Sequence, residues 1–259
     1  MRTLIALLLF TNAFLTAQSQ PELEIRVVYD NTTAKPGQVQ EDWGYAAVVT
    51  FRGRRLLFDS GTKPDLFMEN LGKLGVKPES IESAMISHEH QDHRSGIYQL
   101  FPLHKALPVH FLDSFEGPAW DQAERIGMKP VKVTGPKELL PGMFTTGLVE
   151  GSPNEQALAV ETSKGIVMMV GCSHPGIVKL VETVRRQRGK DSIRLLIGGF
   201  HMFRQQEPEI SAQISPLKQL GVKEVRPAHC TGDLAHSLFE KSWGGAYGKA
   251  GAGNIIRLD

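Results

Sequence analysis

The stretch from Ser87 to Gly96 constrains this chain most strongly, because it contains three histidines and two carboxylates between His88 and His93. Imidazole and carboxylate groups are ligands of borderline cations such as zinc. Apolar residues flank the stretch at 84–86 and 97–101, which predicts a strand, then a polar turn, then the start of a helix. A solvated polar loop is the alternative interpretation, but this density of ligand side chains favours a metal site.

The spacing within this stretch predicts two neighbouring metal positions. Side chains two residues apart in an extended turn point to the same side, so His88 and His90 are expected to bind one ion. Asp92 and His93 then face a second position a short distance away.

Three further histidines come shortly after apolar stretches that are typical of buried strands. They are His174, after residues 166–170, His201, after 193–197, and His229, after 222–225. Histidines in the turns that end such strands are well placed to bind a metal, and a structural role is the alternative for each.

The remaining apolar patterns predict a chain of mixed strands and helices. They predict a hairpin over 45–51 and 54–58, a strand pair over 158–162 and 165–170, strands over 193–197 and 222–225, and helices over 64–74, 177–188 and 208–220.

The His-x-His-x-Asp-His spacing of residues 88–93 resembles the signature of the metallo-β-lactamase superfamily, with Ser95 in place of the first of two usual glycines. The Asp59-Ser60-Gly61 turn resembles a second motif of that superfamily, which implies that Asp59 orients the metal loop by accepting hydrogen bonds. The resemblance implies an α/β fold, an αββα four-layer sandwich, with one hydrolase domain over residues 20–259.

A narrower resemblance lies in three strand-end turns, Gly-Cys-Ser-His-Pro-Gly, Gly-Gly-Phe-His and Pro-Ala-His-Cys-Thr-Gly. These resemble the branch of dihydropterin-ribofuranosyl-aminobenzene phosphate synthase-like proteins. The superfamily usually has a histidine before the central strand and an aspartate at the end of that strand. In this chain residues 154–156, which precede the strand, contain no histidine, and Cys172 follows the strand without a neighbouring aspartate. The departure argues against an antibiotic hydrolase and implies a rearranged site that His174 completes.

The resemblance implies metal-assisted hydrolysis with two divalent metal ions, zinc being expected first and manganese or iron being the alternatives. The expected ligands of the first ion are His88, His90 and His174, and those of the second are Asp92, His93 and His229. Asp92 is also expected to orient the attacking water, and His201 to face the substrate or support the ligands.

The expected substrate is a small phosphate ester or phosphodiester, because two-metal sites stabilise the attacking and leaving oxygens together. A lactone or other cyclic ester is the alternative substrate. A non-catalytic metal-binding protein is the alternative from another class, although six or seven ligands exceed what one structural zinc needs. An iron-dependent oxidoreductase is disfavoured, because no flavin or ferredoxin-like module follows.

The composition limits the partners of the protein. The formal net charge of the 259-residue chain is +1, so no nucleic-acid surface is indicated and a small-molecule substrate is expected. The sequence does not set an oligomeric state.

The first 19 residues have the pattern of a signal peptide, with Arg2, an apolar run from Leu4 to Leu15, and small residues Ala17 and Ser19 before the predicted cleavage point. A periplasmic or secreted protein without a stable membrane span is therefore expected, and an uncleaved anchor is the alternative. Export implies an oxidising compartment, where the two cysteines of the chain could form at most one disulfide. Cys172 and Cys230 lie beside predicted metal ligands, so two free thiols or thiolates near the metals are expected in preference to a bridge.

Overall fold

The computed structural model describes residues 20–189 and 192–259. The predicted signal peptide, residues 1–19, lies outside the described residues. Among the helices that are described, none combines the length and the apolar character that crossing a membrane requires.

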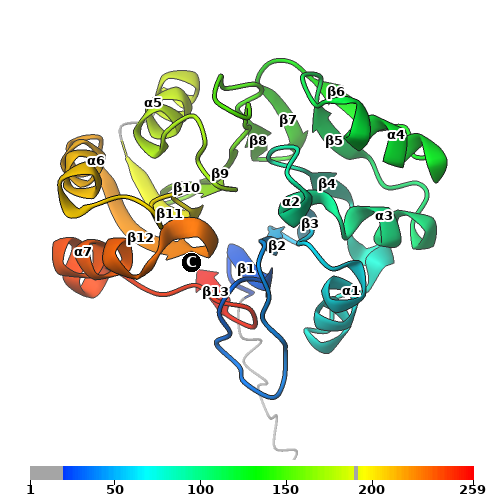
Figure 1. Cartoon of the computed structure of the whole chain (residues 1–259), viewed down its shortest axis with the longest axis horizontal. Helices are drawn as coiled ribbons and strands as arrows, with labels where there is room; N and C mark the ends of the chain where they lie inside the picture. Colours follow the sequence, from blue (N-terminus) through cyan, green and yellow to red (C-terminus); the bar gives the residue numbers. More distant parts are fainter. Residues whose placement is uncertain (1–19, 190–191) are drawn as a thin grey trace, which may run out of the picture.

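Two mixed sheets pack against each other, and helices cover the outer face of each (Figure 1). The first sheet has the order β13-β1-β2-β3-β4-β5-β6 and the second has the order β12-β11-β10-β9-β8-β7. The strands of the first sheet are β1 (Leu23–Tyr29), β2 (Ala46–Phe51), β3 (Arg54–Phe58), β4 (Ser83–Met85), β5 (Val109–Leu112), β6 (Val131–Val133) and β13 (Ile255–Leu258). Those of the second are β7 (Lys137–Leu140), β8 (Met143–Thr145), β9 (Leu158–Thr162), β10 (Gly165–Val170), β11 (Ile193–Gly199) and β12 (Val222–Ala228). The expected αββα sandwich is confirmed.

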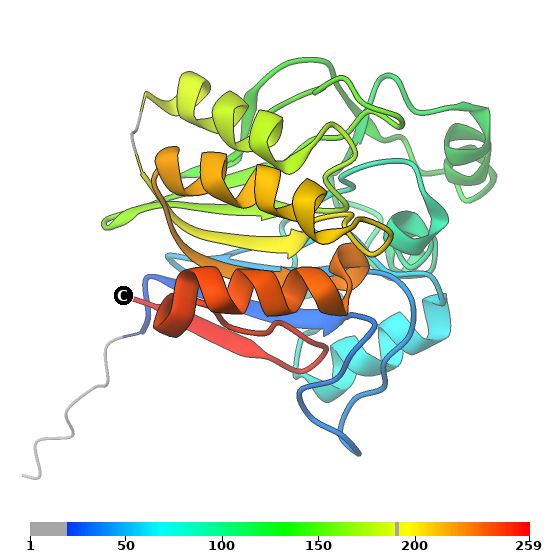
Figure 2. The same cartoon turned by 60° about the vertical axis from the view of Figure 1, so that its left-hand side comes forward.

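The helices divide between the two outer faces. Figure 2 shows α5, α6 and α7 side by side over the second sheet, in agreement with their mutual contacts. These three helices are α5 (Ile177–Arg188), α6 (Glu207–Gln219) and α7 (Asp233–Trp243). The helices beside the first sheet are α1 (Pro64–Lys73), α2 (Gln91–Arg94), α3 (Ile97–Leu100) and α4 (Gly117–Arg125). Short 3-10 turns are η1 (Pro78–Ser80), η2 (Phe101–Leu103), η3 (His229–Thr231) and η4 (Gly244–Ala246).

Successive side chains of a strand point to opposite faces of the sheet, and apolar side chains on both faces form the apolar layers of the sandwich. In β2, Ala47 and Val49 belong to the core between the two sheets, whereas Ala46 and Val48 face the helices outside the first sheet. This follows from the two-residue period of a strand, which sends successive side chains to opposite faces. Both faces of the central strands are therefore apolar.

Strand direction brings the loops of the site together. The strands β10, β11 and β12 are parallel neighbours, so their carboxyl ends lie at one edge of the second sheet. In the first sheet, β4 runs parallel to β3, and the loop that follows it carries the histidine-rich stretch. Segments far apart in the sequence thus meet at one edge of the sandwich.

The predicted elements are found, with some longer than expected. The hairpin of β2 and β3 turns at Arg52 and Gly53, which have φ angles of 48° and 81° as a tight primed turn requires. Strand β12 continues beyond the expected range through Pro227, because it is an edge strand where a missing N–H is tolerated.

Candidate metal centre

The first cluster of ligand atoms comes from His88, His90 and His174, whose side-chain donor atoms lie within 4.8 Å of one another. Nε2 of His88 is 3.2 Å from Nδ1 of His90. Two imidazole nitrogens bound to one tetrahedral zinc ion lie about 3.3 Å apart, given zinc–nitrogen bonds of about 2.0–2.1 Å. Nε2 of His174 is buried without a hydrogen-bond partner, so its lone pair is available to coordinate a cation at this position.

The second cluster consists of Asp92, His93 and His229. The Nε2 atoms of His93 and His229 are 3.2 Å apart, and Oδ2 of Asp92 lies 3.3 Å from Nε2 of His229. The structure therefore brings the six residues predicted as ligands together in the two expected groups. Their binding of metal remains a prediction.

Hydrogen bonds fix which ring nitrogen faces the centre in three of the histidines. Nδ1 of His93 donates to Asp59 over 2.7 Å, and Nδ1 of His229 donates to Asn31 over 3.0 Å. Nδ1 of His88 lies 3.0 Å from Oγ of Ser87, whose own hydroxyl donates to Asp59. Each ring thus turns its Nε2 toward the centre, as outer partners of metal-binding histidines usually arrange.

Asp59 has the orienting position that the resemblance implies. It is fully buried behind the metal loop, where Oδ1 accepts a hydrogen bond of 2.7 Å from the Ser87 amide. The carboxylates of Asp59 and Asp92 raise the pKa of His93 to about 9, against the lowering effect of burial.

Burial lowers the pKa of the three imidazoles of the first cluster, His88, His90 and His174, which keeps them in the neutral form that a metal needs. Burial lowers the pKa of His88 well below its usual value, and neighbouring histidines lower it further. Burial and the nearby His201 likewise lower the pKa of His174 to about 3. Neutral rings keep a lone pair free at neutral pH, so this donor set is suited to a cation.

Glu155 is a central residue of the site that the sequence analysis did not assign. Its fully buried carboxylate accepts hydrogen bonds from four consecutive amides, which belong to Gly171, Cys172, Ser173 and His174. Burial raises the pKa of Glu155 to about 7, although the amide hydrogen bonds lower it. A polar triplet between strands is typical of a loop, so no sequence pattern indicates this role for Glu155.

The loop after β1 supplies further supporting residues. Oδ1 of Asp30 accepts a hydrogen bond of 2.7 Å from the His229 amide, and Nε1 of Trp43 donates over 2.8 Å to Asp92. The Trp43 ring also packs against the His229 ring, with centroids 5.0 Å apart. These contacts fix Asp92 and His229 from the open side of the centre.

Backbone strain is concentrated at the centre. Four of the non-glycine residues with positive φ lie there, namely Asp59 (57°), Ser173 (66°), His201 (52°) and His229 (49°). Such conformations persist where surrounding structure enforces them, and they cluster at functional sites.

His201 and the two cysteines lie beside the clusters. The His201 ring is exposed, and its centroid is 4.4 Å from that of His174. The sulfurs of Cys172 and Cys230 are buried and 3.2 Å apart, longer than the roughly 2.05 Å of a disulfide. The two thiols are free in the structure, as expected.

The chain is similar in sequence and in fold to a synthase and to a metal-dependent hydrolase. No family model matches it. The 7,8-dihydropterin-6-methyl-4-(β-D-ribofuranosyl)-aminobenzene-5′-phosphate synthase of Methanocaldococcus jannaschii is 29% identical over 249 residues, which cover 79% of this chain and 85% of that protein. The crystal structure of a metal-dependent hydrolase of the β-lactamase superfamily matches with a TM-score of 0.74 and 25% identity, over 92% of this chain and 99% of that one.

The chain has the fold of the metallo-β-lactamase superfamily, and these two similarities confirm the resemblance of its histidine-rich stretch to that superfamily. A diphosphatase from the PhnP family has the same superfamily fold, with a TM-score of 0.62 at 14% identity, over 92% of this chain and 98% of its own. The synthase relative agrees with the branch that the three strand-end turns resemble.

Proposed function

We propose that this protein is a metal-dependent hydrolase that acts on a small phosphate ester or phosphodiester. The main support is the pair of adjacent three-residue clusters described above, here called the two triads, whose ligand atoms face a common centre. The rings of His88 and His93, one from each triad, have centroids 4.1 Å apart. Two cations held by these triads would be close neighbours, as in two-metal hydrolases of phosphate esters.

Different residues would have different roles in the proposed hydrolysis. Divalent cations in the triads would lower the pKa of water toward about 7 and neutralise charge on a phosphoryl oxygen. Asp92 is ionised, because hydrogen bonding to His229 and the charge of His93 outweigh burial and lower its pKa. Held by Trp43, it would accept a hydrogen bond from the attacking water and orient it. The exposed His201 would donate a hydrogen bond to a substrate oxygen.

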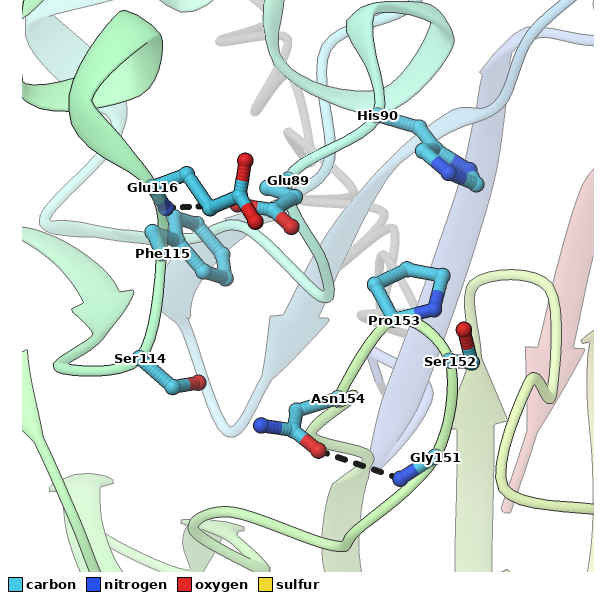
Figure 3. Close-up of a pocket in the computed structure, with 9 residues that line it drawn as sticks. All are labelled: Glu89, His90, Ser114, Phe115, Glu116, Gly151, Ser152, Pro153 and Asn154. Atoms are coloured by element: carbon cyan, nitrogen blue, oxygen red, sulfur yellow. Dashed lines mark hydrogen bonds between the residues drawn. The ribbon is translucent and has the colours of Figure 1, made fainter.

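A cavity of about 420 Å³ beside His90 offers room for the rest of the substrate. Figure 3 shows its polar lining, with the Glu89 and Glu116 side chains opposite His90. Ser114 and Asn154 add hydrogen-bonding groups. Two carboxylates favour a leaving group that donates hydrogen bonds or carries positive charge, and they disfavour a second phosphate.

The names of two similar proteins also support a phosphate-bearing substrate. One is a diphosphatase, and the other is a synthase of a 5′-phosphate compound. The synthase is more similar in sequence to this chain than the diphosphatase is. A second candidate function is therefore bond formation on a phosphate-bearing compound.

The test uses metal-free protein reloaded with zinc or manganese. Substrates are p-nitrophenyl phosphate, bis(p-nitrophenyl) phosphate, a lactone and a β-lactam, and Asp92→Asn is the control for background hydrolysis. We expect turnover of a phosphate ester that depends on metal and on Asp92. Turnover of the lactone alone would select the alternative substrate. Full metal content without any turnover would favour the second candidate function or a non-catalytic metal-binding protein.

A further inference from the structure

We propose that the Cys172 thiolate is a ligand that bridges the two cations of this centre. The proposal rests on the two-cation site proposed above and adds a protein ligand to it. Cys172 directly follows Gly171 at the end of β10, the central strand of the second sheet, where the superfamily pattern usually has an aspartate and this chain has none.

The sulfur of Cys172 lies inside the centre. It is buried, and it is 3.2 Å from Nε2 of His93. A zinc ion with bonds of about 2.3 Å to sulfur and about 2.05 Å to nitrogen holds these two atoms about 3.2–3.6 Å apart, for bond angles between about 95° and tetrahedral. The observed separation is therefore suited to a shared ion.

The same sulfur is near ligand atoms of both triads. It lies within 4.8 Å of those of His88 and His174 from the first triad, and of His93 and His229 from the second. Because a bridging atom must reach both ions, it has to lie between the two sets of ligands. A thiolate sulfur has several lone pairs, so one Cys172 side chain could donate to both ions.

The positions of the two sulfurs favour Cys172 over Cys230 as the bridging ligand. The sulfur of Cys230 groups with Cys172 and His229, and among the described residues it forms no metal-sized cluster with the first triad. A bound cation deprotonates the thiol it contacts, so the location of each sulfur decides which one binds. Glu155 fixes the Cys172 backbone by accepting its amide over 3.1 Å, which keeps the sulfur at the centre.

The chemistry of the site would change with this ligand. Thiolates favour zinc, cobalt or iron over magnesium or calcium, whereas carboxylates favour the harder ions. A thiolate in the place of a bridging carboxylate would therefore make this centre more selective for the softer metals.

Cobalt(II) titration of metal-free protein tests the proposal directly, because sulfur bound to cobalt gives a charge-transfer band in the near ultraviolet. We expect the wild type to bind two equivalents, and the band to grow through both additions, since the sulfur contacts each ion. Cys172→Ser should lose the band, and Cys230→Ser should keep it. The chain has two cysteines, so Cys230→Ser leaves Cys172 as the single thiol and tests the assignment even if Cys172→Ser does not fold.

Several results would overturn the proposal. A band that survives in Cys172→Ser, or disappears in Cys230→Ser, would assign the ligand to the other sulfur. A band that stops growing after one equivalent would make the thiolate a terminal ligand. Two bound equivalents without a band would remove the thiolate but leave the proposed hydrolase intact, whereas no bound cobalt would overturn both.

Discussion

The carboxylate of Glu155 accepts a hydrogen bond of 2.9 Å from the backbone amide of His174. It also binds the three preceding amides, so one side chain fixes the whole turn that follows β10. In the usual superfamily pattern a histidine ligand lies in this part of the chain. Here the position supports the loop from which His174 and Cys172 reach the centre.

Replacing Glu155 with Gln should destabilise the protein and weaken metal binding. A glutamine side chain has the same shape as glutamate, but its NH2 group would face backbone N–H donors. Each buried donor left unsatisfied lowers the free energy of unfolding by about 1–3 kcal/mol. We expect the free energy of unfolding to fall by about that amount at about pH 6, below the Glu155 pKa of about 7, where the wild type does not carry the cost of a buried charge. Urea unfolding measures it. The exposed Glu79 provides a control, since Glu79→Gln should change stability by less than about 0.5 kcal/mol. Equal stability of the two variants would refute the role of Glu155.

The two histidines beside the turn should behave differently when removed. His174→Ala takes one of three ligands from the first position, so bound metal should fall from about two ions toward one and turnover should be abolished. His201→Ala should keep both ions and lose activity by about 10–100-fold, as loss of supporting groups usually does. Elemental analysis of purified variants, together with assays, distinguishes them. If metal falls in His201→Ala and survives in His174→Ala, the two assignments must be exchanged.

Metal affinity should rise with pH because of His93. Its pKa of about 9 means that the metal-free protein holds an imidazolium at neutral pH, and its Nε2 must lose a proton before it binds a cation. Affinity should therefore increase about tenfold per pH unit below about pH 9 from this one proton. Competition with a chromophoric chelator measures the slope.

The same pKa predicts the stability of the metal-free protein. The folded pKa lies above the usual 6.5, so protonated His93 contributes stability fully below about pH 6.5, and that contribution is lost as pH rises through about 9. The total is about 3 kcal/mol, at about 1.4 kcal/mol per pKa unit. Asp59→Asn removes the carboxylate that raises the pKa, so it should flatten both the affinity and the stability profiles. Profiles that keep their slope in Asp59→Asn would contradict this explanation.

Apolar patterns predicted the strands and helices, and the resemblance of the histidine-rich stretch implied the αββα sandwich and the candidate ligands. Alternating and continuous apolar runs mark the strands, and ligand side chains such as His174 and His229 follow those runs directly, so short-range order predicts where they lie. Helix α7 received no prediction, although Ala235, Phe239 and Trp243 are buried with helical spacing.

The supporting residues could not be predicted in this way. Trp43 contacts Asp92 across 49 positions, and Asp30 contacts the His229 amide across 199. Such pairs arise only when two loops meet in the folded sandwich, and no local pattern distinguishes them from ordinary loop residues. The buried Glu155 is the same case, because only tertiary packing gives its carboxylate four amide donors.

Export remains a prediction from residues 1–19. Protein recovered from its native host should begin near Gln20, because the residues at Ala17 and Ser19 match what a signal peptidase cleaves. N-terminal sequencing of the periplasmic or secreted fraction measures it. Intact Met1 on soluble cytoplasmic protein would contradict the prediction.

Close packing of the two sheets at Gly171 gives the last prediction. A Cβ added there would overlap Oγ of Ser87 and lie 3.1 Å from Nδ1 of His88. Ser87 cannot move away without losing its 2.8 Å hydrogen bond to Asp59, which positions the metal loop. Gly171→Ala should therefore displace His88, weaken binding of the first ion and cost about 1–3 kcal/mol of stability.

Gly245 is the matched control for this substitution. A Cβ there meets nothing within 4 Å, so Gly245→Ala should leave metal content unchanged and alter stability by less than about 0.5 kcal/mol. Thermal unfolding with and without metal separates the two effects of Gly171→Ala, since an equal loss in both conditions would reflect packing alone and a larger loss with metal would reflect weaker metal binding. Gly171→Ala protein that binds two ions with wild-type affinity would show that His88 does not depend on this contact.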